Sequence, residues 1–421
     1  MPQGSNTVTL AGLAKEIFPI SEIKAMEQVN TTFYKEIPEK KNLNYSAKDG
    51  GSFTFPVKAY GPHGQKMMNE QEALAKGKSS NVVQGKSFVK EYAGVLQFTK
   101  RELELAKGDV QSFANAKTFE MENLIVNAHK YFNRQVANGD GHGTMTLITG
   151  AQTVTAGNPI NVDDATMFQI GAVIDIFDAA GTTKAVDQAT VTDIDILSTQ
   201  NTITLDIDVV VADNGIICIA GVKDNASSDG KEMIGIPLVV DDGTLQANFQ
   251  NIPRTGAGAV YNYRGITLDA SSAPISVSLI NQLTTRAYRI SGVDFVTSND
   301  AYFLFSPEQW RAYSSLATPQ IRFMPSDAPD LNKQFTQYEC MGKRVVLDTD
   351  VSRTRVYLMK KSAVSMAIPT ALDWESQLGG TTLKWLSGTT QGVMVLYSLL
   401  QLFSQAPRDA AAITSLATVE I

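Results

Sequence analysis

The most regular hydrophobic pattern in the chain runs from about Val110 to Ala137, where apolar residues recur at three- and four-residue spacing. That spacing places them on one face of an amphipathic helix, which would be roughly 40 Å long at about 1.5 Å per residue. Asp109 precedes the pattern and is a good N-cap. Gly139, Gly141 and Gly143 follow it and end the helix. The predicted apolar stripe consists of Met121, Leu124, Ile125, Ala128, Phe132 and Val136.

Alternating apolar and polar residues predict a long β-hairpin between residues 50 and 98. Phe53, Phe55 and Val57 share one face of the first strand, and the return strand is expected from about Ser87 to Phe98. About thirty mostly polar residues separate the two strands, and a connection longer than about 15 residues is normally functional or disordered. An isolated two-stranded hairpin is only marginally stable. We therefore expect this arm to bind a partner outside its own domain.

The segment before the hairpin has too few apolar residues for a core of its own. Leu10, Leu13, Ile17 and Phe18 recur at helical spacing, but the chain then becomes polar up to about residue 48. Such an arm must dock on another surface to become ordered.

Residues 150–225 are rich in β-strand patterns. The stretch 202–211, TITLDIDVVV, alternates strictly and predicts one half-buried antiparallel strand, paired with about 191–197. A turn at 213–215 leads into a strand at 216–220. Several short strands of this kind predict a small barrel or sandwich.

Residues 243–365 mix helices and strands. A helix is predicted at 276–290, and short strands at 343–348 and 355–360. Between them, 295–310 predicts a strand, a turn and a helix, in which Ser306 is the N-cap and proline occupies the first helical position. The whole chain is therefore expected to be an α+β protein.

The longest apolar run, about 392–405, predicts a central strand near the C-terminus. No window approaches the 18 apolar residues or more that a membrane-spanning helix needs, so we expect no membrane association. The N-terminus lacks the basic and apolar regions of a signal peptide, which predicts synthesis in the cytoplasm.

The composition is that of a folded protein that does not grip nucleic acid. The 421 residues suggest two or three packed units, with 43% hydrophobic and 19% charged residues. The formal net charge is −7 and the pI about 5.2. Proteins that hold phosphate backbones are usually basic, so sequence-specific binding of nucleic acid is not expected, although the protein could enclose it.

Two cysteines, Cys218 and Cys340, permit a single disulfide but no disulfide framework. Cys218 lies in an apolar run and is expected to be a small buried residue. Two cysteines and three scattered histidines do not have the spacing of a zinc site, so we expect no metal.

Motifs for cofactor binding are incomplete. Gly77-Lys78-Ser79 and Gly85-Lys86-Ser87 resemble the end of a phosphate-binding loop, but Glu72 and Ser80 occupy the positions where that loop needs glycine. The glycine-rich run 139–143 follows a helix, whereas a dinucleotide loop precedes one. Neither motif supports a cofactor.

Candidate catalytic and metal-binding side chains are better explained by structure. Asp140 and His142 are too few for a metal site. His129 and His63 lack the sequence context of a nucleophile. The acidic pairs Glu70/Glu72 and Asp206/Asp208 lack apolar surroundings that would raise a pKa. We therefore expect no enzymatic activity.

Three segments give the chain a resemblance to a known family. EMENLIVNAHKYFNRQVANGDGHGTMTLITGA resembles the spine helix and following turn of the major capsid proteins of tailed double-stranded-DNA bacteriophages, the HK97-like fold. GGSFTFPVKAYGPHG, with Glu70 and Glu72 further on, resembles the E-loop of that family. GVMVLYSLLQLFSQAPRDAAAI resembles the C-terminal strand of its P-domain. The resemblance covers most of the chain and fails at about 150–225, which resembles an added β-rich domain.

The resemblance implies a division of the chain into the parts of that fold. These are an N-terminal arm at 1–48, an E-loop hairpin at 49–98, the spine helix and first part of the P-domain at 99–149, an inserted β-rich domain at 150–225, an A-domain at 226–365 and the C-terminal part of the P-domain at 366–421.

The implied function is an icosahedral shell, built from pentamers and hexamers, that encloses double-stranded DNA without binding a sequence. The implied partners are neighbouring subunits, a separate scaffolding protein, a portal and, in some shells, a decoration protein. The implied location is the virion capsid, assembled in the host cytoplasm. An encapsulin-like nanocompartment shares the fold and is the alternative, and a soluble enzyme is a third hypothesis.

Some members of this fold cross-link their subunits through a lysine and an asparagine. Five lysines could supply the first partner, namely Lys58, Lys66, Lys76, Lys78 and Lys86. No motif fixes the asparagine or an acidic helper, so we favour ionic contacts with a neighbouring subunit, each contributing about 0–1 kcal/mol. The expected inter-subunit contact residues are Lys58, Lys66, Glu70, Glu72 and Lys78.

Overall fold

The computed structural model describes residues 32–41, 43–46, 51–70, 76–101, 110–196, 201–223, 230–292, 300–317, 339–375, 384–385 and 389–418. The helical spacing at residues 10–18, the Asp109 cap and Glu72 lie outside these ranges.

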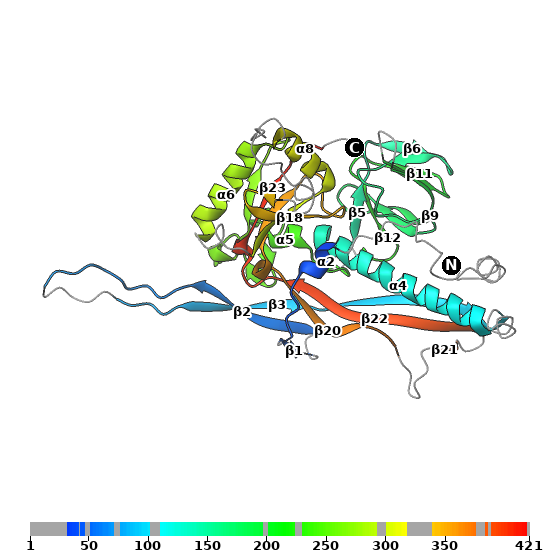
Figure 1. Cartoon of the computed structure of the whole chain (residues 1–421), viewed down its shortest axis with the longest axis horizontal. Coiled ribbons are helices and arrows are strands. Elements are labelled where there is room, and N and C mark those ends of the chain that lie inside the picture. The colour runs from blue at the N-terminus through cyan, green and yellow to red at the C-terminus, as the bar shows by residue number, and fades with distance from the viewer. Residues whose placement is uncertain are drawn as a thin grey trace, which may run out of the picture.

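A long helix and a sheet form the body of the molecule (Figure 1). The helix is α4 (Val110–Asn138), within one residue of the predicted helix. Its stripe residues Ala128, Phe132 and Val136 are buried, and the ring of Phe132 meets Tyr92 of β4 edge-on at 4.9 Å. The sheet consists of β4 (Lys90–Thr99), β20 (Ser365–Trp374), β21 (Lys384–Trp385) and β22 (Gln391–Phe403). The predicted C-terminal strand is therefore confirmed, and as β22 it lies between β4 and β20.

The hairpin differs from its prediction in the return strand. β2 (Ser52–Tyr60) pairs with β3 (Asn81–Phe88), and β1 (Asn44–Ser46) adds a third strand. The predicted return strand, 87–98, coincides mainly with β4, which pairs with β22 and belongs to the body. Alternation alone does not identify a strand's partner, because any antiparallel neighbour gives the same pattern. The base of the hairpin also has a core, since Phe53, Phe55 and Val57 pack in the same buried cluster as α4.

A second sheet, which has six strands, lies beside the body and contains the helices and strands predicted for residues 243–365. Its two helices are α6 (Val277–Ser291), capped by Ser276, and α8 (Pro307–Ala317), where Ser306 Oγ accepts from the backbone N of Gln309 at 3.3 Å. Both helices confirm their predictions. The strands, in sheet order, are β15 (Ile266–Asp269), β23 (Ala410–Thr414), β19 (Val356–Lys360), β16 (Ala301–Phe305), β18 (Lys343–Leu347) and β17 (Glu339–Cys340).

The last strand, β23, changes the expected division of the chain. It pairs with β15 and β19 and not with β22, so the predicted segment 366–421 contributes to two sheets. Short elements connect the sheets, namely α2 (Thr32–Glu36), α5 (Ile236–Val239), β13 (Asn248–Phe249), β14 (Ile252–Pro253), and the 3-10 helices η3 (Tyr261–Tyr263), η5 (Lys361–Ala363) and η6 (Pro407–Asp409).

The β-rich part of the chain has its own core, and its first strand begins at Thr144. Its main sheet runs β5 (Thr144–Leu147), β12 (Ile216–Ile219), β8 (Val173–Phe177), β9 (Lys184–Asp195), β10 (Thr202–Leu205) and β7 (Pro159–Asn161). The two edge strands continue into segments that are hydrogen-bonded to each other, Thr149 N to Asn161 O at 3.1 Å and Asp163 N to Leu147 O at 3.0 Å. These bonds close the six strands into a ring, which we call the insert.

The predicted strand 202–211 is broken in two. β10 pairs with β9 as expected, whereas β11 (Val209–Val211) pairs with β6 (Gln152–Val154) in a separate ribbon. The break lies at two aspartates whose carboxylates accept backbone N–H groups: Asp206 from Thr190 at 2.7 Å and Asp208 from Ala156 at 2.7 Å. These bonds explain why the alternation does not continue as one strand. The turn at Asn214 and the strand that follows it confirm their predictions.

Candidate functional site

The hairpin formed by β2 and β3 projects from the body and carries the predicted contact residues (Figure 1). Lys58, Lys66, Glu70 and Lys78 are all exposed. Lys58 lies on the outer face of β2, opposite the buried Val57 and Ala59. The structure therefore places these four residues along one projecting arm. Their role in contacts between subunits remains a prediction.

Beyond the strands, the two legs of the hairpin touch again at His63 and Lys78. Their backbones exchange two hydrogen bonds, of 3.0 and 2.7 Å. Gly64 lies against Gly77 so closely that a Cβ on Gly64 would be 2.7 Å from the Gly77 Cα. Past this point Met67 is 99% exposed.

A buried polar cluster joins α2, α4 and the loop after β18. The side-chain amide of Asn133 donates to Asp348 Oδ2 at 3.0 Å and to Asp350 Oδ2 at 2.6 Å. Its oxygen accepts from the backbone N of Tyr34 at 2.8 Å, and Asp348 Oδ2 accepts from Phe33 N at 3.2 Å. One asparagine therefore fixes the start of the described chain to the long helix and to the second sheet.

The two carboxylates of this cluster affect each other's ionisation. Burial, and then the charge of Asp348, raise the pKa of Asp350 from 3.8 to about 7. Asp350 therefore changes its charge near neutral pH inside a joint between three elements.

The insert is joined to the body by two antiparallel segments, 139–144 and 230–235, which we call the neck. Glu232 N donates to Gly141 O at 3.1 Å, and Gly235 N donates to Gly139 O at 2.9 Å. A Cβ on Gly230 would lie 1.8 Å from Gly141 O, and one on Gly235 would lie 2.6 Å from Gly139 N. Gly230 and Gly235 are therefore required by the close approach of the two segments, and so is Gly139 at the end of the helix, where a Cβ would lie 2.9 Å from Met233 O.

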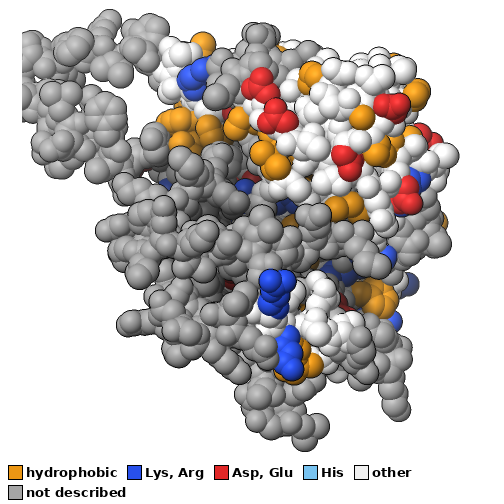
Figure 2. Space-filling model, turned by 90° about the vertical axis from the view of Figure 1, so that its right-hand side faces the viewer, with side chains coloured by type: hydrophobic (Ala, Val, Ile, Leu, Met, Phe, Trp, Pro, Cys, Tyr) orange, Lys and Arg blue, Asp and Glu red, His pale blue; other side chains and the backbone are white. Residues whose placement is uncertain are grey.

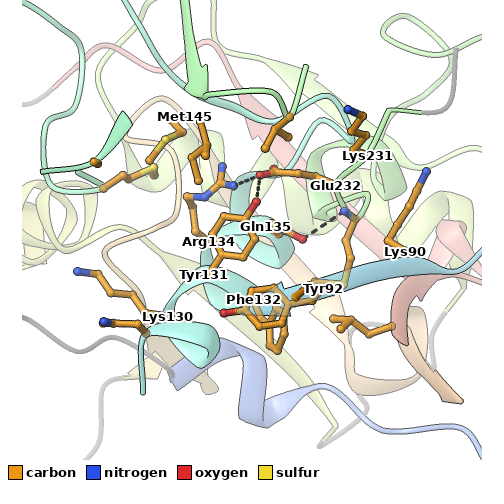
Figure 3. Close-up of a pocket in the computed structure, with 18 of the residues that line it drawn as sticks. Lys90, Tyr92, Lys130, Tyr131, Phe132, Arg134, Gln135, Met145, Lys231 and Glu232 are labelled. Carbon is orange, nitrogen blue, oxygen red and sulfur yellow. Dashed lines mark hydrogen bonds and ion pairs between the residues drawn. The ribbon is translucent and has the colours of Figure 1, made fainter. Parts of the chain in front are cut away.

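Arg134 of α4 clamps both segments of the neck (Figure 3). Its guanidinium donates to Glu232 Oε1 at 2.5 Å and to Thr144 O at 3.2 Å. Tyr131 also donates to Glu232. Burial acts to lower the pKa of Arg134, but the adjacent Glu232 charge outweighs it and raises that pKa. The pair lines a cavity of about 540 Å³ between α4, β4 and the insert.

The candidate ligand motifs have structural roles. The carboxylate of Asp140 accepts from His142 N at 2.8 Å and from the Thr144 hydroxyl at 2.5 Å, so it organises the turn into the insert. Gly85-Lys86-Ser87 lies within strand β3 and not at the start of a helix. In the described part of the chain, no three histidine, cysteine or acidic side chains are grouped so that they could hold a metal ion.

Both cysteines are buried free thiols, so the disulfide that the sequence permits is not formed. Burial raises the pKa of the Cys218 thiol to about 12. This thiol is therefore protonated at neutral pH and unsuited to act as a nucleophile.

Sequence reasoning did not identify the Asn133, Arg134 and Glu232 contacts. A signal was present, because Asn133-Arg134-Gln135 places three polar residues in succession around a helix that is otherwise buried there. Buried polar side chains require partners, but those partners are about 100 to 217 residues away in the chain.

Comparisons with known proteins identify the fold. No protein-family model matches, and no curated protein shows a significant match. The capsid asymmetric unit of cyanophage A-1(L) matches over 95% of this chain and 96% of its own, with 8% identity and a TM-score of 0.58. The capsid of a native GTA particle matches over 98% and 99%, with 11% identity and a TM-score of 0.51.

Within the described residues, none of the helices combines the length and apolar character needed to cross a membrane.

The long helix, the projecting hairpin and the near-complete coverage of both capsid structures agree with the resemblance seen in the sequence. The chain has the HK97-like capsid fold.

Proposed function

We propose that this chain is the major capsid protein of a tailed double-stranded-DNA bacteriophage and assembles through pentamers and hexamers into an icosahedral shell. The observation that carries the proposal is the projecting hairpin. Its tip bears Met67, which is 99% exposed, and a two-stranded arm of this kind is only marginally stable alone. A capsid fold with such an arm fits a subunit that is completed by its neighbours.

The position of the arm favours closed rings. The hairpin extends from one end of the molecule, and the insert lies towards the other (Figure 1). An arm that docks on a different surface of the next subunit makes a head-to-tail contact, and such contacts close into rings when the rotation allows it. Pentamers and hexamers are rings of this kind.

The contact residues of the arm would be Lys58, Lys66, Glu70, Glu72 and Lys78. Four of them are exposed on the described hairpin, which suits ionic contacts with a neighbour. Single exposed ion pairs contribute only about 0–1 kcal/mol, so a shell would depend on many copies.

The net charge of the protein supports a capsid wall that encloses DNA without binding it tightly. The formal net charge is −7. Figure 2, which looks onto one end of the molecule, shows acidic and basic side chains scattered among uncharged and hydrophobic ones on its described surface. A structural role without enzymatic activity follows from this assignment.

The remaining partners and the location belong to the same proposal. The proposed partners are a separate scaffolding protein, a portal and, in some shells, a decoration protein. Synthesis and assembly would take place in the host cytoplasm and the finished protein would lie in the virion capsid.

Expression in a bacterial host, followed by electron microscopy and sedimentation, tests the proposal. Homogeneous closed shells are the expected product, alone or with the scaffolding protein of the same genome. A persistent monomer or dimer in the presence of that scaffold would contradict it. Shells that enclose a specific enzyme instead of DNA would favour the encapsulin-like alternative.

A further inference from the structure

In the described part of the chain, the insert packs as a unit of its own. Its buried cluster shares no residue with the clusters of the body. The ring of six strands is closed by backbone hydrogen bonds, which makes it stiff. Among the described residues, its polar contacts with the body include two long ones beside the neck: Gln169 to Asn127 at 3.4 Å and Asp164 to Arg353 at 3.8 Å.

Open space lies on both sides of the neck. The cavity of about 540 Å³ separates the insert from α4 and β4 (Figure 3). A second cavity, of about 960 Å³, separates it from the loop 351–355. Met145 and Met167 line both cavities. Protein interiors are normally close-packed, and methionine adapts easily to a change of packing.

The neck has hinge-like backbone positions where it enters the insert. Gly141, Gly143 and Gly230 all have positive φ, at 78°, 84° and 58°. Glycine reaches these conformations and their mirror images at little cost, so the backbone can change direction here. Hinges commonly consist of a few such residues between two rigid bodies.

The clamp that holds the neck is incompletely satisfied. Arg134 Nε and Glu232 Oε2 are buried and have no hydrogen-bond partner. Leaving a buried polar atom unpaired costs about 1–3 kcal/mol. Both residues line the cavity of about 540 Å³, and these two atoms are free to donate or accept a hydrogen bond in another position of the neck.

From these observations we propose that the insert swings as a rigid body about the glycine neck, narrowing one cavity as it widens the other, with the Arg134–Glu232 pair limiting the swing. The motion is a property of the single subunit and does not depend on shell formation. It would let one subunit place its insert differently in different positions of an assembly.

Pulsed electron spin resonance on unassembled subunits tests the swing. One spin label, at Val210→Cys, lies on β11, whose Val209 and Val211 belong to the buried cluster of the insert. It is paired with one on α6 of the body, at Thr285→Cys. The control pair, Asp187→Cys and Val210→Cys, lies entirely on the insert. All three positions are exposed, whereas Cys218 and Cys340 are buried and would escape labelling. The insert-to-body distances should be distributed roughly twofold more widely than the control distances.

The role of the clamp is tested with Glu232→Gln, which keeps the shape of the side chain but removes its charge. This change should widen the insert-to-body distribution further. The matched control is Glu36→Gln, which alters another arginine–glutamate pair, 2.7 Å from Arg344 and remote from the neck. An insert-to-body distribution as narrow as the control pair's overturns the proposal. An insert-to-body distance distribution in Glu232→Gln that is no wider than the one in Glu36→Gln also overturns the proposal. If circular dichroism shows that Glu232→Gln does not fold, the proposal is still tested by comparing the insert-to-body and control distance distributions in the otherwise wild-type protein.

Discussion

The side-chain amide of Asn133 donates a 2.6 Å hydrogen bond to the carboxylate of Asp350, 217 residues away in the sequence. The same amide also contacts Asp348, and both aspartates are buried. Both carboxylates accept hydrogen bonds from this one neutral amide. The joint between helix α4 and the second sheet is thus held by hydrogen bonds whose strength depends on the protonation of Asp350.

Replacing Asp350 with asparagine should alter the pH dependence of stability. The folded protein raises the pKa of Asp350 from 3.8 to about 7, so the folded state binds this proton more tightly than the unfolded state does. The stability that the group contributes is present in full below about pH 4 and is lost as the pH rises to about 7.

Asp350→Asn removes this titration and leaves an oxygen to accept from Asn133. We expect the variant to be more stable than the wild type at pH 8 by roughly 2–4 kcal/mol, because each pKa unit corresponds to about 1.4 kcal/mol. Urea unfolding at pH 5 and pH 8 measures the difference. Asp213→Asn, which alters an exposed carboxylate, serves as the control for the lost charge. Equal effects of the two substitutions at both pH values would show that Asp350 does not titrate in this range.

Asn133→Ala should loosen α2 from the body. The substitution leaves the backbone N of Tyr34 and the two buried carboxylates without their shared partner, which should cost about 3 kcal/mol. The backbone amides of residues 32–36 should then exchange hydrogen at least as fast as the fastest-exchanging amides of any other helix. Asn127→Ala, on the same helix but only partly buried, should leave that exchange at the wild-type rate. Wild-type protection in Asn133→Ala would mean that packing of Phe33 alone holds α2.

Local pattern was sufficient to predict α4, α6 and α8, because their apolar stripes lie within the segments and the caps of α6 and α8 lie directly beside them. Ser306 caps α8 from the adjacent position, and the stripe of α4 keeps its spacing to Val136. The central strand β22 was equally clear, since burial on both faces requires a continuous apolar run.

Long-range pairing was not predictable from the same signals. The strand β4 alternates in the way a hairpin partner of β2 would, yet Val95 lies opposite Val395 of β22. The features of the candidate site also separate into those that local sequence predicts and those that depend on long-range contacts. Exposure of Lys58 and Lys78 follows from local alternation and polarity, whereas the contacts of Arg134 with Glu232 depend on how the chain returns from the insert.

Arg254 should tolerate lysine poorly although the charge is kept. Its buried guanidinium donates to the carbonyl oxygens of Leu238, Val239 and Tyr263, at 2.7, 2.9 and 3.1 Å. It also lies 4.0 Å above the ring of Phe249. Burial lowers the pKa of Arg254 to about 10. A lysine ammonium cannot reach three carbonyls in one plane.

We expect Arg254→Lys to lower the free energy of unfolding by about 2–4 kcal/mol, because carbonyl groups at the end of α5 lose their donors. Arg264→Lys is the matched control. Arg264 is partly exposed, lies over Tyr261 and donates one hydrogen bond, to Arg254 O, which a lysine can also make, so this substitution should cost below about 1 kcal/mol. Urea unfolding curves of both variants provide the measurement. Similar losses in the two would show that charge, and not the planar set of donors, is what Arg254 contributes.

Removing the tip of the hairpin should separate folding from assembly. Gly64 and Gly77 are in contact across the two legs, so residues 65–76 can be deleted and the legs joined directly. A longer deletion reaching Gly85 would remove most of β3. A Cβ on Gly85 would lie 2.5 Å from the ring of Phe55, so β3 covers part of the core.

The shortened protein should keep the wild-type circular dichroism spectrum and melting temperature, since the described tip residues are exposed and outside the buried clusters. It should fail to form closed shells in sedimentation and electron microscopy, because the arm no longer reaches a neighbour. Met67→Ser with Met68→Ser tests the apolar part of the contact at full arm length and should reduce shell yield less than the deletion does. Normal shells from the deleted protein would show that the tip plays no part in assembly, and a lowered melting temperature would show that it supports the subunit itself.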